Sequence, residues 1–366
     1  MRPTLSVILP TYNERQNVPI LIERFEKLSL NWVLEVLIVD DNSPDGTSDV
    51  ARTLAKTRPW LRVIQRMHDK GLSQAVMEGF SAASGDVLVV MDADLQHDEQ
   101  VLSNFITAFE SGAELVVGSR KAAGGGVENW SIVRKFVSFV ATQMAAIVLK
   151  KNVSDPMSGF FAIHRKFYEC TAEKINPRGF KILLEFLVHA PQTTQIVEIG
   201  YIFKGRQHGE SKLTSDIMID YVETLYNLKW GKVVPIRFLK YASTGLVGVF
   251  VNQISVLIFK YIFNSQNSTA LAFGIELSIL SNFMMNNYWT FRDVRFKKMP
   301  AILRGGLIFN SVCLAGAAIN YATGLWLISE FKISIYAANF VGILLATFWN
   351  YLINSQVTWT SRRKLK

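Results

Sequence analysis

Hydrophobic and polar positions divide the chain into two unlike parts. Up to about residue 235, segments with apolar residues at helical spacing alternate with short apolar runs at 5–9, 33–39, 62–65, 87–91 and 114–118. Strands that alternate with helices are typical of a doubly wound α/β domain, with parallel strands in its first half. Beyond residue 236 the apolar stretches reach the roughly 20 residues that cross a bilayer. We therefore predict an α/β domain followed by an all-α transmembrane domain.

The apolar part is expected to cross the membrane in four spans, at about 239–261, 268–288, 305–329 and 334–356. The segment before it, 214–235, has apolar residues at helical spacing and ends in basic and aromatic residues that suit a membrane surface. We expect the α/β domain at 1–213, interfacial helices or a linker at 214–235, and the membrane domain at 236–366.

Basic residues gather on one side of the predicted spans. The loop 292–304 carries five Lys or Arg residues and the tail 361–366 carries four, whereas the opposite loops hold Lys260, Glu330 and Lys332. By the positive-inside rule, the α/β domain, the central loop and the C-terminus face the cytoplasm. The net charge of +9 thus comes with cations beside membrane spans, which argues against a nucleic-acid-binding stripe.

Acidic residues follow two of the predicted strands. Asp40 and Asp41 come after the second strand, and Asp92, Asp94 and Gln96 come after the fourth. Ligands of open α/β sheets bind beyond the strand ends, and paired carboxylates there suit a hard divalent cation that also holds phosphate. The alternative is that Asp92 and Asp94 only cap the helix that begins near residue 98. No GxGxxG or GxxxxGK[ST] motif follows these strands, so dinucleotide-binding and P-loop functions lose their main support.

Three segments, PTYNE at 10–14, VDDNSPDGT at 39–47 and DADLQH at 92–97, resemble the signatures of family 2 glycosyltransferases, which have the GT-A fold. The closer resemblance is to dolichyl-phosphate mannose synthases and bacterial polyprenyl-phosphate glycosyltransferases, and it covers about residues 4–230. It implies a Rossmann-like mixed sheet in the catalytic domain. The second part resembles the GtrA-like four-helix membrane domain, with Asn282, Asn286 and Thr290 repeated as Asn350, Asn354 and Thr358.

The resemblance implies a donor site. Asp94 and Gln96 would hold Mg²⁺ or Mn²⁺ against the donor diphosphate, and Asp92 would approach the ribose or sugar. The implied nucleotide-sugar residues are Pro10, Tyr12, Glu14, Val39, Asp41, Asp92, Ala93, Asp94, Arg206 and Lys212. For Tyr12 the alternative is a core aromatic, and for the loop that holds Arg206 and Lys212 it is a solvated basic loop.

The resemblance also implies an acceptor site and a catalytic set. Arg120 and Arg134 would hold the acceptor phosphate, with Ser138 nearby, and the catalytic residues would be Asp92, Asp94, Arg120 and Arg206. A phosphate is already anionic at neutral pH and needs no protein base, so His97, His164 and His189 are interpreted as structural. Glu185 is a weak site candidate, because a lone carboxylate among apolar neighbours is costly.

The predicted function is transfer of a hexose, best matched by mannose from GDP-mannose, to a polyprenyl (dolichyl) phosphate, with inversion and with a metal. Transfer from UDP-glucose to undecaprenyl phosphate is the alternative within the class. A flippase for lipid-linked sugars, with a nucleotide-sugar-binding domain, is the alternative of another class. Glu276 lies inside a predicted span, where a pairing or functional role is the default. The repeated asparagines favour packing between spans over transport.

Overall fold

The computed structural model describes residues 3–68, 70–149, 151–177, 181–205, 215–231 and 233–359. The chain forms two compact units, Met1–Lys229 and Trp230–Lys366. The first is a mixed α/β unit and the second is built of long apolar helices, which confirms the predicted fold class. The predicted boundaries at residues 213 and 235 remain predictions.

Within the described residues, the first unit contains a seven-stranded sheet in the order β3-β2-β1-β4-β7-β5-β8. β1, β2, β3 and β4 run parallel, whereas β7 is antiparallel to both of its neighbours. A separate parallel pair joins β6 to β9. The strands are β1 (Thr4–Thr11), β2 (Val33–Asp40), β3 (Leu61–Gln65), β4 (Val87–Val90), β5 (Leu115–Ser119), β6 (Gly126–Val127), β7 (Phe161–His164), β8 (Ile196–Gly200) and β9 (Ile202–Phe203).

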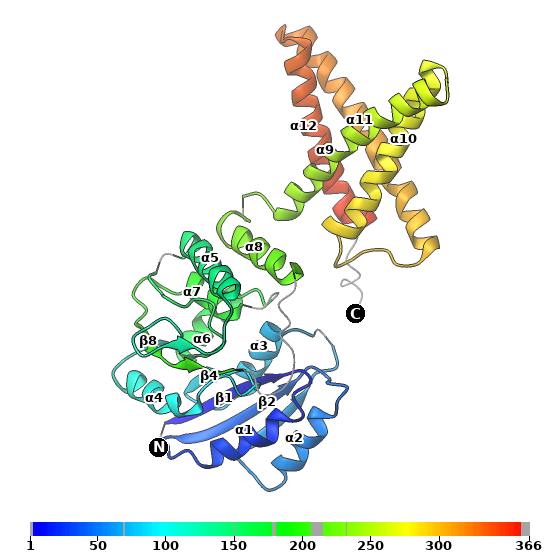
Figure 1. Ribbon diagram of the computed structural model, residues 1–366. Helices are drawn as coiled ribbons and strands as arrows, with labels where there is room; N and C mark the ends of the chain where they lie inside the picture. Colours follow the sequence, from blue (N-terminus) through cyan, green and yellow to red (C-terminus); the bar gives the residue numbers. More distant parts are fainter. Residues whose placement is uncertain are drawn as a thin grey trace. The chain divides into compact units, whose positions relative to one another are not determined.

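Helices cover both faces of this sheet (Figure 1). α1 (Asn17–Glu26), α2 (Thr47–Ala55) and α4 (Leu102–Glu110) pack on one face. α3 (Leu72–Ala82), α6 (Arg165–Thr171) and α7 (Ile182–His189) pack on the other. Because both faces are covered, the central strands are continuous apolar runs, and all four residues of β4 are buried.

The loops that can carry chemistry gather at one edge of the sheet. β1, β2, β4 and β5 all end there, and the antiparallel β7 begins there, since Val90 at the end of β4 pairs with Phe161 at the start of β7. Gly200, the last residue of β8, pairs with Ser119 at the same edge. The edge therefore collects loops from six strands, as parallel α/β sheets do at ligand sites.

Two further helices, α5 (Ile132–Val148) and α8 (Ser215–Trp230), lie side by side in the first unit (Figure 1). The Tyr221 hydroxyl donates to the Ala141 carbonyl at 2.6 Å. α5 leaves Ile132, Val133, Phe136 and Phe139 exposed, a large apolar face that suits a lipid surface. Met144, further along the same helix, packs inward on the α5–α8 cluster.

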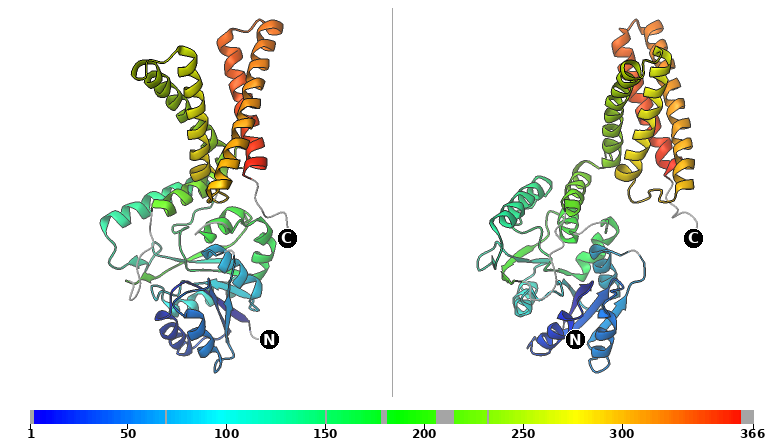
Figure 2. Two further views of the ribbon diagram at one scale, coloured as in Figure 1. Left: turned by 90° about the vertical axis from the view of Figure 1, so that its right-hand side faces the viewer. Right: turned by 45° about the vertical axis from the view of Figure 1, so that its right-hand side comes forward.

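In the described part of the second unit, four helices are long and apolar enough to cross a membrane, by length and composition. Figure 2 shows them as two hairpins, α9 with α10 and α11 with α12. The helices are α9 (Ile236–Leu257), α10 (Asn267–Met285), α11 (Met299–Phe331) and α12 (Ile335–Ile353), and π-helical turns extend three of them over Ile258–Ile262, Asn286–Thr290 and Asn354–Thr358.

The repeated asparagines form hydrogen bonds and packing contacts between these helices. Asn286 Nδ2 donates to the Thr244 hydroxyl of α9 at 2.9 Å, and Asn354 Nδ2 donates to the Tyr241 hydroxyl of α9 at 3.1 Å. Asn282 and Asn350 instead lie against glycines of the facing helix: a Cβ on Gly248 would come within 2.4 Å of Asn282, and one on Gly316 within 2.2 Å of Asn350. These contacts are those of helix packing, as predicted from the repeat.

Candidate active site

The loop after β2 is fixed by a buried aspartate. Asp40 accepts hydrogen bonds from the backbone N–H and hydroxyl of Ser43, and from the hydroxyls of Thr11 and Ser48. Its carboxylate is fully buried, so it serves the loop and not a ligand. The neighbouring Asp41 forms an ion pair with buried Arg66 and accepts from the Gly71 N–H at 2.7 Å. Asp41 therefore ties the loop after β2 to the start of α3.

The predicted nucleotide residues after β1 lie beside this loop. Tyr12 is 41% exposed, with the Lys70 ammonium 5.8 Å from its ring centre, so the core alternative for Tyr12 is wrong. Glu14 accepts from Asn17 Nδ2 at 2.6 Å. Pro10 pairs with Val39 in the β1–β2 register, and the Val39 side chain is fully buried, so Val39 can offer a nucleotide only its backbone.

The carboxylates after β4 lie in a tight, buried turn. Asp94 is 6% exposed, its Oδ1 accepts from the Gln96 N–H at 3.2 Å, and Leu95 between them has a φ of 62°. Asp98, and neither Asp92 nor Asp94, caps the 3₁₀ turn Glu99–Val101 that leads into α4. The capping alternative is therefore wrong. Ala93 is buried in the core at 2% exposure and contributes backbone alone.

Gln96 is oriented by a strand end far along the chain. Its Nε2 donates to the Lys204 carbonyl at 2.9 Å, and the Lys204 N–H donates back to the Gln96 carbonyl at 2.9 Å. The amide nitrogen is thus engaged, which leaves the amide oxygen as the atom suited to an ion. Together with the Asp94 carboxylate it makes a hard-oxygen donor pair that fits Mg²⁺ or Mn²⁺ completed by water and phosphate. Across the described residues, no three His, Cys, Asp or Glu side chains gather as a metal-binding group.

Asp92 lies between an imidazole and a glycine. His97 Nε2 is 3.4 Å from Asp92 Oδ2, and His97 Nδ1 is 2.8 Å from the Tyr201 hydroxyl. On the β7 side, a Cβ on Gly159 would lie 2.7 Å from Asp92 Oδ2. Only a residue without a side chain allows this close approach.

Arg120, after β5, reaches the same edge already paired. Its Nε and Nη2 donate to the two oxygens of buried Asp155, each at 2.7 Å, and its backbone N–H donates at 3.1 Å. Burial opposes the charge of Asp155, but these bonds outweigh it and hold the pKa of Asp155 below its usual range. Burial likewise opposes the charge of Arg120, yet Asp155 raises the pKa of Arg120. The bidentate pair fixes the plane of the guanidinium.

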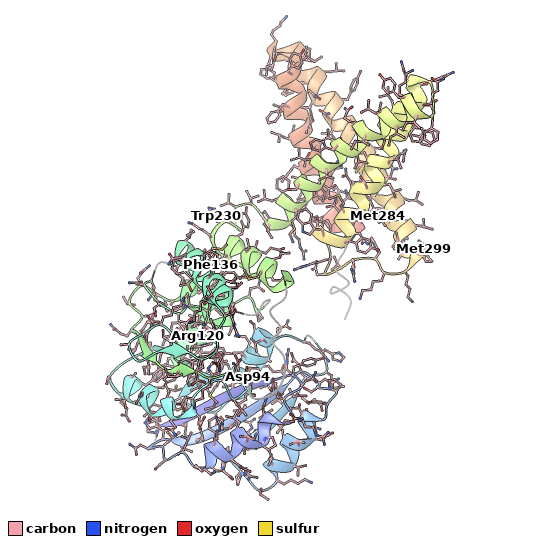
Figure 3. All side chains as sticks on the ribbon, viewed as in Figure 1. Asp94, Arg120, Phe136, Trp230, Met284 and Met299 are labelled. Atoms are coloured by element: carbon pink, nitrogen blue, oxygen red, sulfur yellow. The ribbon has the colours of Figure 1, made fainter. Side chains whose placement is uncertain are left out.

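The predicted acceptor residues share one aromatic ring. The guanidinium carbons of Arg120 and Arg134 lie 5.4 Å and 4.3 Å from the Trp130 ring centre. Ser138 follows Arg134 by one helical turn on the same face of α5, and Lys121 Nζ donates to Thr142 one turn further on. Figure 3 shows Arg120 between Asp94 and Phe136 of α5. The structure thus brings Arg120, Arg134 and Ser138 to one cationic region.

Several residues at this edge were not singled out from the sequence. Arg66, Tyr201 and Lys181 carry no local motif, although a salt-bridge partner for Asp41 could have been sought. Lys181 Nζ donates to the Met157 carbonyl at 3.3 Å, and burial, followed by the charge of Arg120, lowers the pKa of Lys181. Arg206 and Lys212 lie outside the described residues.

Glu185 lies on α7, packed inward at 7% exposure. Burial raises the pKa of Glu185 to about 7. In the described part of the chain Glu185 Oε2 has no hydrogen-bond partner, and His189 Nδ1 lies 3.7 Å from it. The role of Glu185 as a site candidate remains a prediction.

Comparisons with known proteins match both units. The model of glycosyl transferase family 2 matches residues 6–171, and that of the GtrA/DPMS transmembrane domain matches residues 240–359. The dolichol-phosphate mannosyltransferase of Pyrococcus furiosus is 39% identical over 360 residues, covering 98% of this chain and 99% of that protein. The dolichol-phosphate mannosyltransferase of Saccharomyces cerevisiae is 37% identical over 250 residues, covering 65% of this chain and 92% of that protein. A solved glucosyl-3-phosphoglycerate synthase from Mycobacterium tuberculosis covers 62% of this chain and 80% of its own, at 20% identity and a TM-score of 0.47.

Proposed function

Because this chain belongs to the dolichol-phosphate mannosyltransferase family, with a family 2 glycosyltransferase domain and a GtrA/DPMS transmembrane domain, we propose that it transfers mannose from GDP-mannose to dolichyl phosphate. The observation that carries the proposal is the sheet edge itself. It places the oxygen pair of Asp94 and Gln96 in one unit with the cationic region around Arg120 and an exposed apolar helix. A diphosphate donor and a lipid phosphate acceptor need these three features together.

On the donor side, the chain has to support the departure of a nucleoside diphosphate. Tyr12, Glu14 and Asp41 would line the nucleotide, with backbone contacts from Pro10, Val39 and Ala93, and Asp92 would accept from a donor hydroxyl. Asp94 and Gln96 would hold the divalent cation, Mg²⁺ or Mn²⁺, which when bound neutralises charge on the leaving diphosphate without a proton. The positively charged side chains of Arg206 and Lys212 would also pair with that diphosphate.

On the acceptor side, Arg120 and Arg134 would hold the phosphate, with Ser138 as a further donor. An oxygen of the acceptor phosphate attacks the anomeric carbon as the bond from that carbon to the diphosphate breaks, and GDP leaves with the electron pair. A single displacement inverts the anomeric centre. The attacking phosphate is already anionic, so no residue has to remove a proton. Arg120, held in plane by Asp155, orients the nucleophile, and orientation of this kind can supply several kcal/mol of the barrier.

The chain is a membrane protein, and we place its catalytic domain at the cytoplasmic face. The segment 292–304, which leads into the first turns of α11, carries five basic residues, whereas the loop between α11 and α12 holds Lys332. Basic loops remain on the cytoplasmic side. The exposed face of α5 would then contact lipid or the polyprenyl chain of the acceptor.

The test is a transfer assay with the full chain in detergent. Labelled GDP-mannose or UDP-glucose is incubated with a short dolichyl phosphate and Mg²⁺, Mn²⁺ or EDTA, beside Asp94→Ala and the control Asp49→Ala, which removes an exposed carboxylate on α2. We expect metal-dependent label in the lipid phase from GDP-mannose, lost with Asp94→Ala and kept with Asp49→Ala. Label from UDP-glucose alone would favour the glucosyl alternative. Donor binding without any transfer would favour the flippase alternative.

A further inference from the structure

His97 is buried behind the turn that carries Asp92, Asp94 and Gln96, and the reaction proposed above gives it no role. Its side chain is 2% exposed, yet it contacts Asp92, whose side chain is 36% exposed. The buried imidazole of His97 therefore lies directly behind Asp92, whose carboxylate is partly exposed. The same imidazole is held from its other side by the Tyr201 hydroxyl at 2.8 Å.

The hydrogen bonds of this group have a direction. The Asp92 carboxylate can only accept, so in the neutral imidazole Nε2 carries the proton and Nδ1 accepts. The Tyr201 hydroxyl must then donate to Nδ1. Burial raises the pKa of Tyr201, so the phenol keeps the proton that it donates. Tyr201, His97 and Asp92 therefore form a chain of donors that ends on the Asp92 carboxylate.

The imidazole has little freedom to turn away. The ring centres of Phe160, Tyr201 and Phe203 lie 5.3 to 5.5 Å from the ring centre of His97. Rings at such distances pack in preferred orientations. Gly159 closes the Asp92 carboxylate from the side of β7. The position of Asp92 is thus set by a packed aromatic cage and by the backbone of another loop.

We propose that His97, supported by Tyr201, is a positioning residue that fixes the Asp92 carboxylate so that it accepts a hydrogen bond from a hydroxyl of the nucleotide-sugar donor. The inference rests on the proposed function for the identity of the donor. It differs from the interpretation of His97 as structural, since a structural histidine would act through stability alone. His97 does not itself touch the substrate.

Five variants and one control separate positioning from packing. His97→Leu removes the hydrogen bonds and keeps an apolar side chain, whereas His97→Gln keeps an amide N–H that can donate to Asp92. Tyr201→Phe removes one hydroxyl and leaves the aromatic cage in place. Asp92→Asn is made by itself and in combination with His97→Leu, and His189→Gln on α7 is the matched histidine control.

Each variant is measured in detergent for its melting temperature, for kcat and for KM of both substrates, and GDP-mannose binding is measured by calorimetry. We expect His97→Leu to lower kcat/KM for GDP-mannose by about tenfold, within the range of contacting residues, and to leave KM for dolichyl phosphate unchanged. His97→Gln should retain most of the activity, and Tyr201→Phe should lie between the two. In the Asp92→Asn background, His97→Leu should add little further loss.

The opposite pattern overturns the inference. If His97→Leu and His97→Gln lose activity equally, or the losses from His97 and Asp92 simply add, His97 is structural. The proposed function fails separately: if the wild type binds GDP-mannose without transferring mannose, calorimetry on the same variants still decides the role of His97. If the wild type binds neither GDP-mannose nor UDP-glucose, both proposals fall.

Discussion

Arg120, which we propose binds the acceptor phosphate, is already held in place by the fold. Two of its guanidinium nitrogens are bound by Asp155, and the Asp155 N–H is bound in turn by Glu198 Oε1 at 3.2 Å. A flexible arginine would lose side-chain entropy on binding phosphate, and here much of that entropy is lost on folding. The cost is a buried ion pair, whose partners depend on each other.

Removing the charge of Asp155 should therefore harm both stability and acceptor binding. Asp155→Asn keeps the size of the side chain but leaves Arg120 without its counter-charge, and breaking a buried pair from one side costs about 3 kcal/mol. We expect a lower melting temperature and a higher KM for dolichyl phosphate, with KM for GDP-mannose little changed. Steady-state kinetics with each substrate varied in turn measures this, and an unchanged acceptor KM would contradict it.

Glu185 predicts a dependence of stability on pH. Its carboxyl has a pKa of about 7 in the folded chain, raised by burial from 4.5. Between these two values the folded state binds more protons than the unfolded state, so stability falls as pH rises, and the loss levels off above about 7. His189 Nδ1 lies 3.7 Å from the same carboxylate. Melting curves of wild type and Glu185→Gln from pH 5 to 8 should diverge as pH rises, and parallel curves would refute the prediction.

At the scale of elements, the membrane helices pack through pairs of asparagine and glycine. In each hairpin, an asparagine of the second helix lies against a glycine of the first, as Asn282 does against Gly248. An asparagine of the first helix likewise lies against a glycine of the second, as Asn320 does against Gly342. Small residues let the helix backbones approach each other closely. Because lipid supplies no hydrophobic driving force between helices, this packing and the polar contacts of the amides stabilise their association. This arrangement explains why the asparagines recur at equal spacing in both hairpins.

Gly316→Ala tests the packing directly. A Cβ there would lie 2.2 Å from Asn350 Oδ1, whereas one on Gly324 of the same helix meets nothing within 4 Å. Overpacking costs about 1–3 kcal/mol, while alanine in an open helical position gains up to about 1 kcal/mol. We expect Gly316→Ala to lower the melting temperature in detergent and Gly324→Ala to keep or raise it. Equal effects of the two would mean that α11 and α12 are not held by this contact.

At the scale of the whole molecule, the chain joins a family 2 glycosyltransferase domain to a transmembrane domain. The family assignment covers both units, so the transmembrane domain belongs to the family architecture. Which side of the membrane the catalytic unit faces follows, in our proposal, from the basic segment 292–304.

Cysteine labelling can test this orientation. In a chain without Cys170 and Cys313, single cysteines are placed at Lys298 in the basic loop and at Ser265 between α9 and α10. In intact cells, a membrane-impermeant maleimide should label Ser265→Cys and spare Lys298→Cys until the cells are opened. The reverse pattern would place the catalytic unit on the outer side.

The sequence by itself determined much of this protein. Apolar runs of two lengths distinguish buried strands from membrane helices, because burial in protein and in lipid need different lengths of apolar chain. The Asp92–Gln96 turn is predicted because strand ends carry ligand residues in α/β sheets, whereas Arg120 is implied by the resemblance to the family 2 glycosyltransferases. These are local signals, readable within about 20 residues.

Only the tertiary structure decided which residues contact Asp92, Arg120 and His97. β7 inserts antiparallel between β4 and β5, and it brings Gly159 against Asp92 and Asp155 against Arg120. The Tyr201 hydroxyl contacts His97 although the two residues are 104 positions apart in the sequence. Strand order is set by packing summed over the whole sheet, so no local pattern shows which loop will face Asp92. For that reason His97 looked structural in the sequence, and its contact with a half-exposed carboxylate emerged only from the fold.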